Sequence, residues 1–334
     1  MKIIVPMAGK GKRMRPHTLT TPKPLIPIAG KSIVKRLVED IAAMCSEPIE
    51  EVAYIIGRSF GDEVETDLHT IAGSVNARAT IHYQDEALGT GHAILCAESS
   101  LSGNVIIAFA DTLFQADFTI DPEEDGIVYT KKVEDPSSFG VVVTDENNII
   151  QRLEEKPEDF VSDQAIIGIY YFKDGDMLKN ELQYLIDNNI KDKGEFQLTN
   201  AMENMKEKGK KLKTANVNLW MDCGNKDVTV ETNREVLKLE KEQDLIEHSA
   251  QRDNSVIIPP SYVGEEAVIK NSVIGPYASI GNHSKVEHSI VSDSIIMDHT
   301  HIKEGHLSNS LLGNQVEYRG KPDDLSLGDF SKVK

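Results

Sequence analysis

Apolar residues in the first two-thirds of the chain occur in short blocks that alternate with amphipathic stretches. Four blocks have the length of a buried strand: residues 2–7, 51–56, 80–83 and 105–110. Three stretches between them repeat apolar residues at helical spacing: residues 32–44, 60–72 and 90–97. This alternation predicts an α/β fold with a mostly parallel sheet covered on both faces. Further strands over 126–130, 139–144 and 165–172 predict a mixed sheet, and further helices are expected over 176–189, 196–208 and 226–247.

The pattern changes near residue 250. From residue 254 to 316 there is no helical period, and aliphatic residues recur at steps of six: Val263 and Ile269, then Ile274, Ile280 and Val286, then Ile290, Ile296 and Ile302. This period predicts a parallel β-helix in which each of these aliphatic side chains points inward, and the segment resembles the left-handed hexapeptide-repeat domains. The phase of the repeat slips near residues 271, 290 and 307. A small antiparallel sandwich is the less favoured alternative, because turn-flanked strands of period two are hard to place here.

A chain of 334 residues is long for a single hydrophobic core. We therefore predict an α/β domain over residues 1–235, a helical linker over 236–253, a short left-handed β-helix over 254–318 and a tail over 319–334. The tail is polar and has no period, which is typical of a loosely attached end.

The composition restricts the compartment and the partners. No apolar stretch approaches the ~20 residues that span a bilayer, and the apolar run at the N-terminus is too short for a signal peptide. Cys45, Cys96 and Cys223 are few and far apart, which argues against a disulfide framework or a zinc site. We therefore expect a reducing, cytoplasmic location. The net charge of −18 argues against binding to nucleic acid or to an anionic membrane.

One segment contradicts this acidic character, because residues 1–36 contain nine Lys and Arg residues and no Asp or Glu. The simple interpretation is a chance cluster on a solvated face. Gly9 and Gly11 favour a site for a polyanion instead, since glycine lets backbone N–H groups approach phosphate oxygens. Arg13 could clamp phosphate oxygens in a bidentate manner, and Lys23 could add a compact charge.

The extended pattern is more specific. Gly9-x-Gly11-x-Arg13-Met14-x-Pro16, followed by Pro22-Lys23-Pro24-Leu25, resembles the signature of the sugar-1-phosphate nucleotidylyltransferases. The glucose-1-phosphate thymidylyltransferases and the N-acetylglucosamine-1-phosphate uridylyltransferases are the most similar branches. The resemblance implies a Rossmann-like fold in which the loop at Ala8, Gly9 and Gly11 wraps a triphosphate. It also implies catalytic roles for Arg13, on the β and γ phosphates, and for Lys23, on the α phosphate. Lys12 departs from the family, which usually has Ser or Thr there.

Joining two phosphate anions requires a divalent cation with carboxylate ligands. Asp111 directly follows the apolar run 105–110, at the strand end where open α/β sheets bind ligands. Asp222 is the second candidate. Asp commonly ends strands as a turn residue, so neither position is informative alone. The resemblance implies that Asp111 and Asp222 together bind Mg²⁺.

The resemblance also implies residues for both substrates. Gln84 matches a glutamine that pairs with a pyrimidine base, with Gly89 and Thr90 beside the nucleotide; its amide offers the donor and the acceptor that uracil or thymine requires. His92 is interpreted as a packed helix residue. Residues matching the sugar-phosphate site are Gly140, Glu155, Lys156, Glu195 and Thr199. The implied substrates are therefore UTP or dTTP and a sugar-1-phosphate.

The implied reaction is attack of a sugar-1-phosphate oxygen on the α-phosphorus, with release of pyrophosphate. One alternative is acyl transfer by the C-terminal domain, suggested by its five histidines: His283, His288, His299, His301 and His306. Their irregular spacing is more typical of exposed turn residues. A second alternative is a non-catalytic sensor or scaffold, which the presence of Arg13, Lys23, Asp111 and Asp222 disfavours. The β-helix is expected to drive self-association into a homo-oligomer, because its open ends and flat faces need covering.

Overall fold

The computed structural model describes residues 1–116, 119–321, 326, 328, 331 and 332. The chain divides into two units, the first with residues 1–26 and 32–224, and the second with residues 27–31 and 225–334. Much of the predicted tail over 319–334 lies outside the described residues.

A mixed sheet is the centre of the first unit. Within the described residues it has nine strands: β1 (Lys2–Pro6), β4 (Glu51–Ile56), β5 (Arg78–Tyr83), β6 (Val105–Ala108), β8 (Gly126–Lys132), β9 (Gly140–Thr144), β10 (Ile150–Glu155), β11 (Gln164–Phe172) and β12 (Leu212–Asn216). The main path runs in the order β10-β9-β11-β6-β1-β4-β5, and β8 joins β11 to β12. β6, β1, β4 and β5 are parallel, whereas β11 is antiparallel to β6. The predicted mixed Rossmann-like sheet is confirmed.

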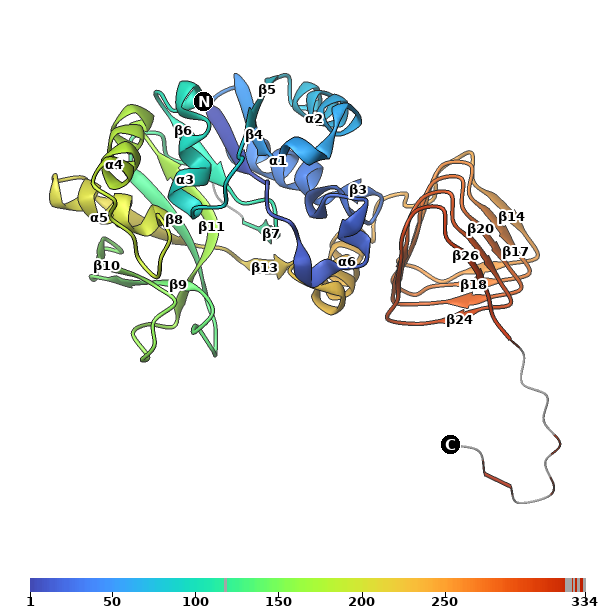
Figure 1. Cartoon of the computed structure of the whole chain (residues 1–334). Helices are drawn as coiled ribbons and strands as arrows, with labels where there is room; N and C mark the ends of the chain where they lie inside the picture. Colours follow the sequence, from blue (N-terminus) through green and yellow to red (C-terminus); the bar gives the residue numbers. More distant parts are fainter. Residues whose placement is uncertain (117–118, 322–325, 327, 329–330, 333–334) are drawn as a thin grey trace. The chain divides into compact units, whose positions relative to one another are not determined.

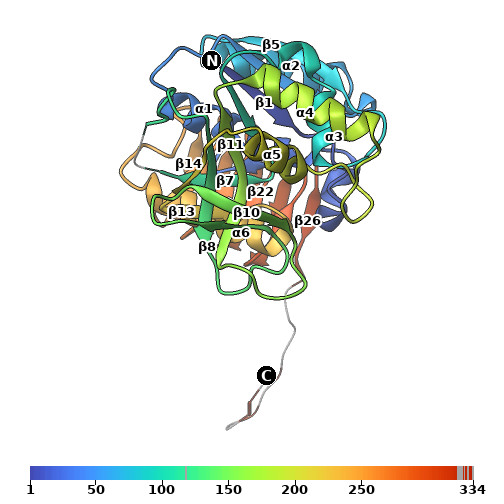
Figure 2. The same ribbon diagram turned by 90° about the vertical axis from the view of Figure 1, so that its left-hand side faces the viewer.

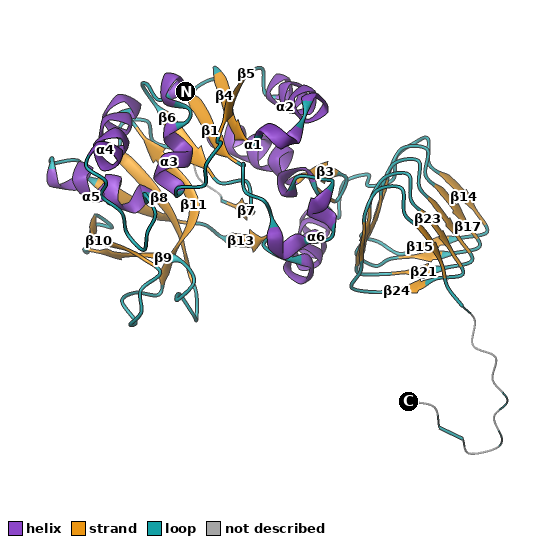
Figure 3. Ribbon diagram, viewed as in Figure 1, coloured by secondary structure: helices purple, strands orange, loops and turns teal. Residues whose placement is uncertain are grey.

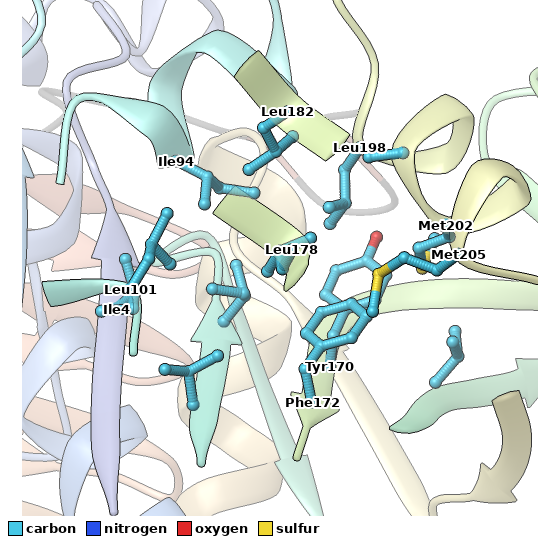
Figure 4. Close-up of a cluster of buried hydrophobic side chains, with 14 of the residues drawn as sticks. Ile4, Ile94, Leu101, Tyr170, Phe172, Leu178, Leu182, Leu198, Met202 and Met205 are labelled. Atoms are coloured by element: carbon cyan, nitrogen blue, oxygen red, sulfur yellow. The ribbon is translucent and has the colours of Figure 1, made fainter. Parts of the chain in front are cut away.

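Helices cover both faces of this sheet, as the sequence predicted. α1 (Ile33–Met44) and α2 (Asp62–Ser74) lie on one side in Figure 1, and α3 (Thr90–Leu95), α4 (Gly175–Asp187) and α5 (Leu198–Glu207) lie on the other. Figure 2 shows the second group in front of the strands. Ile4 and Phe172 from the sheet pack there against Leu178, Leu182 and Met202 from the helices (Figure 4). Burial of this apolar layer holds the parallel strand ends in fixed positions.

A parallel β-helix forms most of the second unit, and Figure 3 shows its short strands joined by turns. Its strands stack into three faces, which we name the charged face, the apolar face and the covered face. The charged face comprises β14 (Gln251–Asp253), β17 (Val268–Lys270), β20 (Lys285–Glu287), β23 (His301–Lys303) and β26 (Glu317–Arg319). The apolar face comprises β15 (Val256–Ile257), β18 (Val273–Ile274), β21 (Ile290–Val291) and β24 (His306–Leu307). The covered face comprises β16 (Tyr262–Val263), β19 (Ala278–Ile280), β22 (Ser294–Ile296) and β25 (Leu311–Leu312). The predicted left-handed β-helix is confirmed.

The strand register explains the phase slips in the repeat. A coil of three full repeats of six would pair Val268 with Val286, but Val268 pairs with Lys285 instead. The next coil is shorter still, because Lys285 pairs with His301. Some steps of the repeat therefore have five residues. The prediction that Ile290 points inward is wrong for this reason: Ile290 is 45% exposed, and its neighbour Val291 is fully buried.

The helix predicted over 226–247 is α6 (Lys226–Leu239), which ends eight residues early. Residues 240–250, all of them described, contain turns but no helix, so the predicted helical linker over 236–253 is wrong beyond Leu239. The sequence Glu-Lys-Glu-Gln-Asp from residue 240 offers no apolar face that a helix could bury. α6 packs on the covered face, where Asn233 Oδ1 accepts hydrogen bonds from Ser279 Oγ (2.7 Å) and from the backbone N–H of Ala29 (2.9 Å).

The C-terminal histidines occupy two kinds of position. His283, His288 and His299 are turn residues with positive φ, as predicted for exposed turns. His301 and His306 are strand residues instead.

Two short strand pairs remain among the described residues. In the first unit, β7 (Thr112–Gln115) pairs antiparallel with β13 (Leu219–Asp222). The other pair is β2 (Pro27–Ile28) with β3 (Lys31–Ser32).

Candidate active site

A cavity of about 460 Å³ opens in the first unit where β1, β5 and β6 end. Most of its lining comes from the segments that follow these three strands, which agrees with the position of ligand sites in open α/β sheets. Ten of the fifteen predicted site residues line it: Ala8, Gly9, Gly11, Arg13, Lys23, Gln84, Gly89, Thr90, Asp111 and Glu195. Lys12, which departs from the family pattern, also lines the cavity and is exposed.

The loop after β1 has a conformation that requires glycine at one point. Gly11 has φ +53°, and a Cβ there would lie 2.9 Å from Cγ2 of Thr18. The Thr18 hydroxyl donates a hydrogen bond to the Gly11 carbonyl (2.8 Å), which fixes this turn. A Cβ on Gly9 would meet no heavy atom within 4 Å, so the backbone of Gly9 borders open space. The loop can therefore present backbone N–H groups to an anion.

Arg13, Lys23 and Asp111 line one end of the cavity, and Asp222 lies beside Asp111 without lining the cavity itself. Lys23 Nζ lies 3.3 Å from Asp111 Oδ2. The Cys223 N–H donates to the Asp111 carbonyl (3.0 Å), and Asp222 is opposite Thr112 in the β13–β7 pair, so the two aspartates are neighbours. Burial raises the pKa of Asp222; Lys23 and Arg13 act to lower this pKa, and the charge of Asp111 raises it further. The fold thus brings together residues from three distant parts of the chain.

The aspartate pair fits a divalent cation that takes its remaining ligands from a substrate and from water. Within the described residues, no group of three or more His, Cys, Asp or Glu side chains is placed to hold a metal by itself. Mg²⁺ commonly binds through one or two carboxylates and completes its shell with water and substrate phosphate oxygens. Asp111 and Asp222 supply that number and type of oxygen ligand.

The predicted sugar-phosphate residues form a second group, of which only Glu195 lines the cavity. Gly140 and Glu155 are register partners in β9 and β10, and a Cβ on Gly140 would lie 2.9 Å from Glu155 Oε2. Burial raises the pKa of the Glu155 carboxyl; Lys156 lowers it, and nearby Glu195 raises it further. Glu155, Lys156 and Glu195 are therefore neighbours, with Lys156 Nζ 3.8 Å from Glu155 Oε1. Thr199 is buried in α5 and does not line the cavity.

Phe109 is a cavity residue that sequence reasoning interpreted only as part of a strand. Its ring packs edge-on against Tyr170, with the ring centroids 6.3 Å apart. Burial raises the pKa of the Tyr170 phenol, and the charges of Glu155 and Asp111 raise it further, so Tyr170 lies near both groups of acidic residues. The position of Phe109 two residues before Asp111 is the signal that could have identified it.

The segment after β5 forms another wall. The Gln84 N–H donates to the Ile56 carbonyl (2.9 Å), and Gln84 Nε2 lies 3.4 Å from His92 Nδ1. The Thr90 hydroxyl donates to Gln197 Oε1 (3.0 Å) and accepts from the Leu198 N–H (3.0 Å). Thr90 therefore uses its hydroxyl to join α3 to the start of α5.

The sequence model of the nucleotidyl transferase family matches residues 2–239, more than half of the chain, and the chain belongs to this family. Over its whole length it is 28% identical to the glucose-1-phosphate thymidylyltransferase of Streptomyces antibioticus, of which it covers 99%. It is 31% identical over 348 residues to the bifunctional protein GlmU of Methanocaldococcus jannaschii, in a match that covers 95% of this chain and 79% of GlmU.

A solved structure shows the same fold. A UDP-glucose pyrophosphorylase complexed with UDP-glucose aligns with a TM-score of 0.55 and 24% identity, covering 71% of this chain and 98% of that one. Together these similarities confirm the family and the enzyme class predicted from the sequence. Among the described residues, no helix combines the length and the apolarity needed to cross a membrane.

Proposed function

We propose that the chain transfers a nucleotidyl group from UTP or dTTP to a sugar-1-phosphate and releases pyrophosphate. The observation that carries this proposal is that Arg13, Lys23 and Asp111 line one cavity together with Gln84, and that Asp222 lies beside Asp111. Relatives named as a glucose-1-phosphate thymidylyltransferase and a UDP-glucose pyrophosphorylase support the same substrate classes.

In this reaction, an oxygen of the sugar-1-phosphate attacks the α-phosphorus of the nucleotide. The bond from this phosphorus to the bridging oxygen breaks, and the electron pair leaves with pyrophosphate. The nucleophile is already an anion, so no side chain needs to remove a proton. Arg13 and Lys23 neutralise the charge that accumulates on the phosphates and align them for in-line displacement. Mg²⁺ held by Asp111 and Asp222 would supply further charge neutralisation.

The remaining residues are assigned by the part of the site in which they lie. We assign the triphosphate to the loop at Ala8, Gly9 and Gly11, and the pyrimidine base to the wall at Gln84, Gly89 and Thr90. The sugar phosphate is assigned to the neighbouring group: Gly140, Glu155, Lys156, Glu195 and Thr199.

The test is pyrophosphate release from UTP or dTTP with sugar-1-phosphates and Mg²⁺, for the wild type and for Asp111→Asn. We expect the substitution to lower kcat by roughly 10²-fold or more, because it removes charge at the phosphate site. Asp176→Asn is a matched control: Asp176 also pairs with a lysine, at 3.4 Å from Lys179, and its side chain is 60% exposed against 54% for Asp111.

The control should retain wild-type turnover, and both variants should melt at the wild-type temperature. Wild-type turnover by Asp111→Asn would refute the metal assignment. A wild-type protein that binds nucleotide and sugar phosphate without releasing pyrophosphate would instead support the sensor alternative.

We propose in addition that the chain forms a homo-oligomer through the apolar face of the β-helix. Register aligns Val256, Val273, Ile290 and His306 in one outward column on this face. Val256 is 56% exposed and Ile290 is 45% exposed. An outward column of the charged face contains Lys270, Glu287, Lys303 and Arg319 instead, and water can solvate these charged side chains. Aligned β-branched residues on a flat face favour pairing with the same face of a second copy.

A further inference from the structure

Gln84 and His92 make a contact in which the amide nitrogen faces a ring nitrogen. Gln84 Nε2 lies 3.4 Å from His92 Nδ1. An amide NH₂ group has two donor hydrogens and no acceptor, so His92 Nδ1 must accept in this arrangement. One hydrogen of the Gln84 amide is occupied, while its second hydrogen and its oxygen remain for a ligand in the cavity.

Both partners are held by backbone hydrogen bonds of their own. The Gln84 N–H donates to the Ile56 carbonyl (2.9 Å), which continues the pairing of β5 with β4. His92 is the third residue of α3, whose start is fixed because the Gly91 N–H donates to the Phe196 carbonyl (2.8 Å). The Phe196 N–H donates in turn to the Leu88 carbonyl (2.8 Å). The contact therefore joins two fixed elements of the fold.

The orientation of a glutamine amide decides which pyrimidine it can pair with. Uracil and thymine present an N–H donor beside a carbonyl acceptor. Cytosine presents a ring-nitrogen acceptor beside an amino donor in the same two positions. An amide that is free to exchange the places of its nitrogen and oxygen offers its donor and acceptor in either order and so fits both kinds of base. An amide held in one orientation fits only one kind without leaving a buried polar group unpaired.

We propose that His92 is a positioning residue that holds the Gln84 amide in one orientation and thereby selects uracil or thymine over cytosine. This inference rests on the proposed function, in which Gln84 pairs with the base. His92 does not line the cavity, so it acts through Gln84 and does not contact the nucleotide.

The experiment compares UTP, dTTP and CTP with the wild type, His92→Phe, His92→Leu and His92→Asn. Both kcat/KM in the pyrophosphate assay and Kd from calorimetry are measured. The two apolar variants remove the acceptor, and we expect the preference for UTP or dTTP over CTP to fall roughly 10-fold, chiefly through KM. His92→Asn should restore much of the preference, because its side-chain oxygen can accept from Gln84. His69→Phe changes an exposed histidine of α2 and should keep the wild-type preference.

A merely structural role for His92 predicts a different result, in which activity falls equally with all three nucleotides. An unchanged preference in either folded apolar variant would overturn the proposal, even if the nucleotidyl transfer itself were established. Calorimetry separates the role of His92 from the reaction itself. If the wild type binds UTP or dTTP selectively without turnover, the proposed reaction is rejected, but the effect of the His92 variants on base selectivity is still measured. A wild type with equal affinity for UTP and CTP would overturn the selectivity directly.

Discussion

Glu51, at the start of β4, is a carboxylate that is only 2% exposed. Ser100 Oγ and Thr80 Oγ1 each donate to its Oε1 (both 2.6 Å), and Arg78 donates to its Oε2 (2.8 Å). Burial raises the pKa of Glu51, but these three hydrogen bonds more than offset burial and bring the pKa down to about 2. The buried carboxylate therefore links β4 to β5 and to the turn before β6, and β5 and β6 both end at the cavity.

We predict that Glu51→Gln lowers the free energy of unfolding by about 2 kcal/mol near neutral pH, because hydrogen bonds to a charged group are lost. The folded-state pKa of Glu51 lies below its ordinary value of 4.5. Its stabilising effect is therefore complete above pH 4.5 and is lost as the pH falls towards 2. Urea unfolding at about pH 7 and about pH 3 should show the difference between variant and wild type narrowing at the lower pH. Glu50→Gln, at the exposed neighbouring position, should have little effect at either pH.

At the scale of elements, the β-helix is stabilised by buried hydroxyls as well as by its aliphatic interior. Ser272 and Ser289 occupy the same position in successive coils. Each hydroxyl donates to the carbonyl two residues before it (2.7 Å in both cases) and accepts an N–H from the next coil: Ser272 Oγ from Ser289 N (3.0 Å), and Ser289 Oγ from Gly305 N (2.9 Å). These bonds satisfy backbone groups at corners where the strands are interrupted.

Ser289→Ala should destabilise the β-helix by about 1–3 kcal/mol, because it leaves the buried N–H of Gly305 without an acceptor. Ser308→Ala removes a hydroxyl from an exposed position and serves as the matched control. Thermal unfolding followed by circular dichroism measures both. Equal melting temperatures for the two variants would show that this column of hydroxyls contributes nothing to stability.

At the scale of the whole molecule, the apolar face gives a test of self-association. Val256→Lys combined with Ile290→Lys places two charges in the outward column of this face, and we expect it to convert the oligomer to monomer. Glu265→Lys changes charge at an exposed turn and should leave the assembly intact. Light scattering coupled to size exclusion measures both masses. A monomeric wild type, or a double variant that remains oligomeric, would contradict this interface.

Most of the fold could be predicted because its elements bury continuous or periodic apolar sequence. β7, β12 and β13 escaped prediction because they are short or rich in polar residues, and their partners come from distant parts of the chain. β10 pairs with the adjacent β9, but its own sequence is rich in polar residues. A strict period of six places Ile290 inward. The coils fall short of three full repeats and do not keep this period, so Ile290 points outward instead. The domain boundaries at residues 235 and 254 and the roles of the site residues stay predictions.

The amino-acid sequence specifies which kinds of group are available: a glycine loop, Arg13 and Lys23, a carboxylate at the end of β6, and a glutamine after β5. Local pattern is sufficient for this, because strand ends and glycine turns are specified by neighbouring residues. Which of these groups come into contact depends on the three-dimensional fold. The pairing of β7 with β13 brings Asp222 beside Asp111, and the anchoring of α3 brings His92 to Gln84. The first contact depends on the register between segments far apart in sequence, and the second on the packing of α3 against Phe196, and periodicity encodes neither.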